Sequence, residues 1–135
     1  MRTDIHFLIV NDAAPMRSIV SHLLKELGYL KISEAVDGAM ALRAFKNAQR
    51  VGAPINFVIT DCAMPIMNGL DLIRTIRATP ELADLPVLMV TPQAKREHIL
   101  AAIEAGANDY IVRPFNAGAL DRKLTRILAK KTSAA

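Results

Sequence analysis

The sequence predicts an α/β fold in which helices cover both faces of a five-stranded parallel sheet, a doubly wound arrangement. Five short apolar runs alternate along the chain with five longer segments whose apolar residues recur at helical spacing. The apolar runs are nearly continuous, which is typical of parallel strands buried on both faces. The connections are short, which favours consecutive strand–helix–strand units. The 135 residues fit one domain, taken as residues 1–135.

The first half of the chain contains three predicted strands and two predicted helices. Pro15 suits the first turn of a helix, where its missing N–H matters least. Gly28 ends the apolar periodicity of that helix and is a predicted C-terminal cap. The predicted strands are residues 5–10, 31–35 and 55–60, and the second helix is residues 38–50.

The second half continues the alternation with three helices and two strands. Gly106 is expected to close the middle helix, and Asn116 is expected to cap the last one. The predicted helices are residues 70–78, 93–105 and a final one after Asn116, and the predicted strands are residues 87–90 and 109–112.

Polar side chains directly follow several predicted strands, at the edge where doubly wound sheets bind ligands. Two of them, Asp12 and Asp61, are carboxylates that repel each other unless a cation such as Mg²⁺ neutralises them. A carboxylate beside a metal ion is a candidate nucleophile toward phosphorus. Thr91 offers a hydroxyl donor and Arg113 a planar cation that suits phosphoryl oxygens. Taken singly, each of these residues also fits an ordinary loop, strand-end or salt-bridge role.

Four blocks of sequence, in order and at the right separations, resemble the signature of response-regulator receiver domains. They are residues 11–12, 60–69, 88–91 and 110–115. The resemblance covers residues 5–130, so it is far more specific than any single motif. Three further stretches resemble the stand-alone chemotaxis receivers in particular, namely residues 23–28, 86–91 and 101–110.

The resemblance implies a flavodoxin-like (βα)₅ fold with strand order 2-1-3-4-5, and a signalling role rather than enzymatic activity. It implies that a histidine kinase phosphorylates Asp61, with Mg²⁺ held by Asp12, Asp61 and the backbone carbonyl of Ala63. Thr91 and Tyr110 would then switch the face of the fourth helix, fifth strand and fifth helix for a target, such as a flagellar motor switch or another chemotaxis component. The residues predicted on that partner face are Lys95, Arg96, Ile99, Val112, Lys123 and Arg126.

Three residues depart from the receiver pattern in the same pocket. Asn11 replaces a second acid, which lowers the charge that attracts Mg²⁺. Arg113 replaces a lysine, and the two cations are not interchangeable in a tight site. Pro92 lacks the N–H that the family backbone offers to the phosphoryl group. We therefore expect altered metal affinity and phosphoryl lifetime, with a degenerate, phosphorylation-independent binding module as the alternative.

Other function classes are less favoured. A phosphatase with an aspartate nucleophile needs a second acid two residues on, where this chain has Ala63. The net charge of +4 is compatible with nucleic-acid binding. However, the basic residues are scattered, aromatic residues make up 4% of the chain and tryptophan is absent, which disfavours a surface for stacking bases. No apolar stretch is long enough for a membrane helix, and no signal peptide is expected. The single cysteine, Cys62, is consistent with a cytoplasmic location.

Overall fold

The computed structural model describes residues 4–62, 64, 67–92 and 95–134. Its five strands form one sheet in the order β2-β1-β3-β4-β5, and every neighbouring pair is parallel, which confirms the predicted fold. The strands are β1 (His6–Val10), β2 (Lys31–Ala35), β3 (Phe57–Asp61), β4 (Val87–Thr91) and β5 (Asp109–Val112). The helices are α1 (Ala14–Glu26), α2 (Gly38–Arg50), α3 (Gly69–Ala78), α4 (Arg96–Ala105) and α5 (Ala117–Ala134), with a short 3₁₀ helix η2 (Pro80–Leu82).

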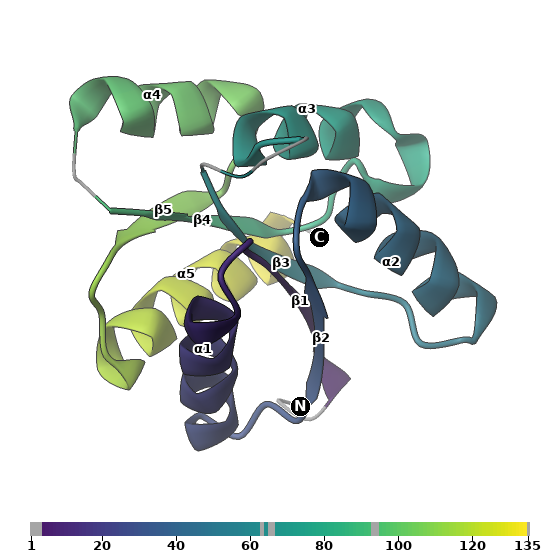
Figure 1. Cartoon of the computed structure of the whole chain (residues 1–135), viewed down its shortest axis with the longest axis horizontal. Helices are drawn as coiled ribbons and strands as arrows, with labels where there is room; N and C mark the ends of the chain where they lie inside the picture. Colours follow the sequence, from purple (N-terminus) through teal and green to yellow (C-terminus); the bar gives the residue numbers. More distant parts are fainter. Residues whose placement is uncertain (1–3, 63, 65–66, 93–94, 135) are drawn as a thin grey trace.

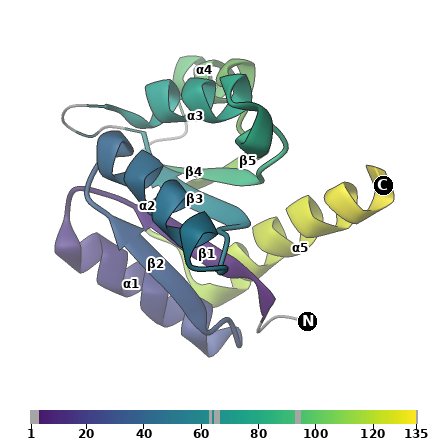
Figure 2. The ribbon, with the colours of Figure 1, turned by 90° about the vertical axis from the view of Figure 1, so that its right-hand side faces the viewer.

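The helices cover the two faces of the sheet unequally, with α1 and α5 on one face and α2, α3 and α4 on the other (Figure 1, Figure 2). Because side chains alternate along a strand, β1 sends Phe7 and Ile9 to the first face and Leu8 and Val10 to the second. All four are at most 2% exposed. Burial on both faces explains why the strands are nearly continuous apolar runs.

Polar caps and glycines set the helix ends. The side chain of Asn116 accepts a hydrogen bond from the backbone N–H of Ala119 at 2.8 Å, which confirms the predicted cap of α5. Gly28 and Gly106 have φ of 95° and 115°, in the left-handed region that glycine tolerates, so the predicted ends of α1 and α4 are confirmed.

Several element bounds differ from the sequence prediction. β3 begins at Phe57 rather than residue 55, because Asn56 first pairs with β1 through its side chain, whose Oδ1 accepts the His6 N–H at 2.7 Å. The helix predicted over residues 93–105 begins at Arg96, because Lys95 is in an extended conformation. β3 and β4 each include the polar residue predicted to follow them, Asp61 and Thr91.

Candidate functional site

Asp61 lies at the carboxyl end of β3 in the middle of the sheet and is 5% exposed. The backbone N–H of Cys62 donates to its Oδ1 at 2.8 Å. The N–H of Gly69 donates to the carbonyl of Cys62 at 3.1 Å, and a Cβ on Gly69 would collide with the Asp61 carbonyl oxygen. The start of α3 therefore packs directly on the backbone of Asp61 and leaves no room for a side chain at Gly69.

Asn11 follows β1 and is 5% exposed beside Asp61. Its side-chain oxygen accepts the Ala13 N–H at 2.8 Å, which fixes the orientation of the amide. Its NH₂ group consequently faces Asp61 and donates to Oδ2 at a long 3.4 Å. Arg17 donates to the Asn11 carbonyl at 2.8 Å and also pairs with Glu34 at 2.9 Å, so the backbone here is held as well. In this orientation Asn11 presents a donor rather than a metal ligand to the site.

Thr91 ends β4 and Arg113 directly follows the neighbouring strand β5, and the Arg113 N–H donates to the Thr91 carbonyl at 2.9 Å. Thr91 is 3% exposed. The Nε of Arg113 is buried without a hydrogen-bond partner among the described residues, and the Arg113–Pro114 peptide bond is cis. With Pro92, Arg113 lines an apolar pocket of about 300 Å³ that also involves α1. An unsatisfied buried guanidinium N–H is costly, which makes Arg113 a candidate anion-contacting residue.

Burial raises the pKa of the Cys62 thiol, and the charge of Asp61 raises it further. A hydrogen bond with Thr91 and the charge of Arg113 act in the opposite direction. Cys62 thus responds electrostatically to three of the predicted site residues. The protonated thiol is a poor nucleophile, consistent with a packing role.

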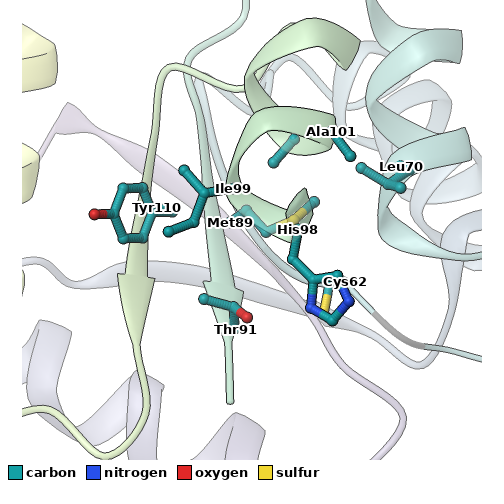
Figure 3. A pocket seen from close by; sticks show the side chains of 9 residues that line it. Cys62, Leu70, Met89, Thr91, His98, Ile99, Ala101 and Tyr110 are labelled. Carbon is teal, nitrogen blue, oxygen red and sulfur yellow. The ribbon is translucent and has the colours of Figure 1, made fainter. Parts of the chain in front are cut away.

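A pocket of about 230 Å³ lies between β4, β5 and α4 and connects Thr91 with Tyr110. Figure 3 shows the Tyr110 ring turned away from Thr91, and Cys62, His98 and Ile99 also line the pocket. The pocket has room for part of an aromatic ring. The predicted switch residues therefore share one cavity, with Tyr110 directed outward.

The structure brings Asn11, Asp61, Thr91 and Arg113 together at one edge of the sheet, as the sequence predicted. Asp12 follows β1 with an exposed side chain. Ala63, predicted to offer its carbonyl, lies outside the described residues. The oxygen donors of Asp12 and Asp61 fit Mg²⁺, which accepts one or two carboxylates and keeps several waters.

The predicted partner face is less uniform than expected. Lys95 and Arg96 are exposed at the start of α4, whereas Ile99 lines the Thr91 pocket. Val112 is half-buried in β5. Lys123 and Arg126 on α5, also predicted on the partner face, both contact Asp109 of the same chain.

Sequence reasoning missed Asp109 and the contribution of His98 to the Thr91 pocket. An acid directly before Tyr110 and two cations three residues apart on the next helix were the available signal for Asp109. Nothing in the sequence indicated His98, because its place depends on how α4 packs over β4.

A model of the response regulator receiver domain matches residues 7–125 of the chain. The chain belongs to the response-regulator receiver family. Two curated relatives are the chemotaxis protein CheY-3 of Vibrio cholerae, 45% identical over 96% of each chain, and CheY of Pseudomonas aeruginosa, 43% identical over 91% of this chain and 95% of that protein.

Solved receiver structures agree with this fold. CheY4 of Vibrio cholerae is 31% identical, with a TM-score of 0.77 over 91% of this chain and 98% of that one. The receiver domain of the sensor histidine kinase PA1611 from Pseudomonas aeruginosa, described with a magnesium ion in its active-site cleft, is 26% identical, with a TM-score of 0.80 over 93% and 98%. Within the described part of this receiver, no helix has the length and apolar character to span a membrane.

Proposed function

We propose that this receiver is a two-component response regulator that accepts a phosphoryl group at Asp61 from a histidine kinase in chemotaxis or motility signalling. The observation that carries the proposal is the buried carboxylate of Asp61 at the centre of the sheet edge, with Thr91 and Arg113 beside it. The family match and the two CheY relatives support it. Its place of action would be the cytoplasm, with no nucleic-acid or membrane partner.

The transfer chemistry needs little beyond positioning. A carboxylate oxygen of Asp61 attacks the phosphorus of a phosphohistidine. The P–N bond breaks, and the histidine nitrogen leaves with the electron pair and takes up a proton. Thr91 and Arg113 donate to the phosphoryl oxygens, whereas Pro92 offers no N–H there. Mg²⁺ bound by Asp12, Asp61 and the Ala63 carbonyl would supply positive charge to the carboxylates and the phosphoryl group.

The output would pass through Tyr110 and the face of α4, β5 and α5. Movement of Thr91 toward the phosphoryl group changes the pocket that it shares with Tyr110, so the ring can move inward. That rearrangement alters the surface of Lys95, Arg96, Ile99, Val112, Lys123 and Arg126 offered to the target. The phosphoryl group can bias this equilibrium only by stabilising the two states differently. The protein acts as a phosphoacceptor, and its only turnover is gain and loss of its own phosphoryl group.

One observation favours a second candidate, a receiver that binds its partner without phosphorylation. The Asn11 amide donates toward Asp61, and Arg113 adds a nearby positive charge. The negative charge of Asp61 is therefore partly compensated by the chain itself, which reduces the need for a cation.

Titration with Mg²⁺ and then with beryllium fluoride, a phosphoryl mimic, tests the first proposal. We expect saturable amide shifts in NMR spectra that extend from Asp61 through Thr91 to Tyr110. The matched control is Asp61→Asn, which should abolish the response to beryllium fluoride. An unchanged spectrum of the wild-type protein at millimolar Mg²⁺ and beryllium fluoride would instead support the phosphorylation-independent module.

A further inference from the structure

Asp109, the first residue of β5, forms ion pairs with two cationic side chains of α5. Its side chain is 14% exposed. Oδ1 accepts the Tyr110 N–H at 2.8 Å and pairs with Lys123 Nζ at 3.2 Å, and Oδ2 lies 3.7 Å from an Nη of Arg126. Lys123 is 24% exposed, so this ion pair is better shielded from solvent than a typical surface pair.

Lys123 also contacts the switch tyrosine. Its Nζ lies 4.6 Å from the centroid of the Tyr110 ring, within the range of a cation–π interaction. Asp109 therefore holds the cation that stabilises the outward ring seen in Figure 3. The neighbouring pocket of about 230 Å³ leaves space into which the ring could turn.

We propose that Asp109 is an internal competitor for the partner: its carboxylate occupies the place that an acidic partner segment would take on Lys123 and Arg126. We call Asp109, Lys123 and Tyr110 the Asp109 latch. Charge complementarity indicates the partner's chemistry, because Lys95, Arg96 and Lys130 are also exposed on α4 and α5. When carboxylates of the partner form ion pairs with Lys123 and Arg126 in place of Asp109, the cation–π contact between Lys123 and Tyr110 is lost and the Tyr110 ring turns inward. The signalling consequence rests on the proposed function, but the latch itself does not.

The first part of the test observes Tyr110 without any phosphoryl donor. The chain has two tyrosines, and Tyr29, which is 2% exposed against Phe7, gives an internal reference for ¹⁹F NMR of 3-fluorotyrosine protein. Asp109→Asn keeps an acceptor for the Tyr110 N–H but removes the charge. We expect it to raise the inward population of Tyr110 about two- to five-fold and to leave the Tyr29 signal unchanged. In a Lys123→Gln background the same change should add no further shift.

The second part measures affinity for a synthetic glutamate-rich helical peptide. We expect Asp109→Asn to bind it about three-fold or more tightly than the control Asp71→Asn. Asp71 pairs with Arg74 on α3, so this control raises the net charge equally and also breaks one ion pair. Equal behaviour of the two variants in both measurements, including no peptide binding by either, overturns the latch. Because neither measurement uses phosphate or Mg²⁺, a latch that works can be separated from phosphorylation that fails.

Discussion

At the scale of single residues, the neutral side-chain amide of Asn11 keeps a second negative charge away from Asp61. The Ala13 N–H holds its oxygen, so its NH₂ group faces Asp61. A carboxylate at this position would keep the Ala13 contact but place negative charge beside Asp61. The same substitution should therefore have opposite effects with and without a cation.

Asn11→Asp is expected to raise the affinity for Mg²⁺ about three- to ten-fold, because a further carboxylate attracts the cation. Without Mg²⁺ the same variant should lose about 1 kcal/mol of unfolding free energy through repulsion with Asp61. Calorimetric titration and urea denaturation with and without Mg²⁺ measure the two effects. Asn11→Ala, which adds no charge, is the control. Equal Mg²⁺ affinity in the aspartate and alanine variants would show that charge at this position does not govern the site.

The Cys62 thiol reports the charge of Asp61 through its pKa. Burial and Asp61 raise this pKa above 9.0, so alkylation of the single cysteine by iodoacetamide should become fast only above that pH. Asp61→Asn should move the rate profile to lower pH, because one of the two raising causes is removed. Asp71→Asn should leave the profile in place, and an identical profile for both variants would contradict the assignment.

The same shift has a consequence for stability. A thiol whose pKa is raised in the folded state contributes stability that is fully present below the unfolded value near 9. This contribution is lost as the pH rises through the folded pKa. Alkaline conditions should therefore destabilise the wild-type protein more than Cys62→Ala.

At the scale of elements, Arg77 of α3 joins the segment before β4 to the turn before β5. Its guanidinium donates to the carbonyls of Gly106, Ala83 and Leu85 and to the side chain of Asn108, at 2.6 to 3.0 Å. Burial lowers its pKa, and Asp84 partly opposes that effect. All five N–H donors of the guanidinium take part, which a lysine cannot reproduce.

Arg77→Lys is expected to lower the free energy of unfolding by about 2–4 kcal/mol, because several partly buried carbonyls lose their donors. Urea denaturation followed by circular dichroism measures the loss. The matched control is Arg74→Lys on the exposed side of the same helix, whose side chain is 59% exposed and pairs only with Asp71 among the described residues. That control should stay within about 0.5 kcal/mol of wild type. A similar, small loss in both variants would show that the hydrogen bonds of Arg77 contribute little to the free energy of unfolding.

The elements that could be predicted from the sequence are those specified locally. Apolar periodicity predicted all five strands and all five helices with starts within three residues of those observed, and Asn116 and Gly106 marked helix ends by their own chemistry; the end of α5 at Ala134 was not predicted. The order of the strands depended on the family resemblance, since periodicity does not fix it. The 3₁₀ helix at Pro80–Leu82 was not predicted.

Contacts between distant segments could not be predicted in the same way. The orientation of the Asn11 amide depends on a backbone N–H of the next loop. The pairing of Asp109 with Lys123 depends on the packing angle of α5 on β5. The hydrogen bonds of Arg77 need the segments before β4 and before β5 to be in place. The sequence therefore predicted that the site lies at the edge of the sheet, but it did not predict the hydrogen bonds and ion pairs between distant side chains.

At the scale of the whole molecule, the Asp61 site and the α4–β5–α5 face are joined by the pocket that Thr91 and Tyr110 both line. If the two sites share one equilibrium of the Tyr110 ring, their coupling must be reciprocal. A ligand at either site stabilises the inward ring and so favours binding at the other. The size of the coupling is limited by how differently each ligand binds the two states.

We therefore expect beryllium fluoride with Mg²⁺ to raise the affinity of the glutamate-rich peptide about five-fold or more, and saturating peptide to raise the affinity for beryllium fluoride by the same factor. Calorimetric titrations in both orders measure the two factors. In Asp109→Asn the factors should fall toward one, because Lys123 and Arg126 are available to the peptide before the mimic binds. A factor of one in the wild-type protein, with both ligands bound, would mean that Tyr110 does not connect the two sites.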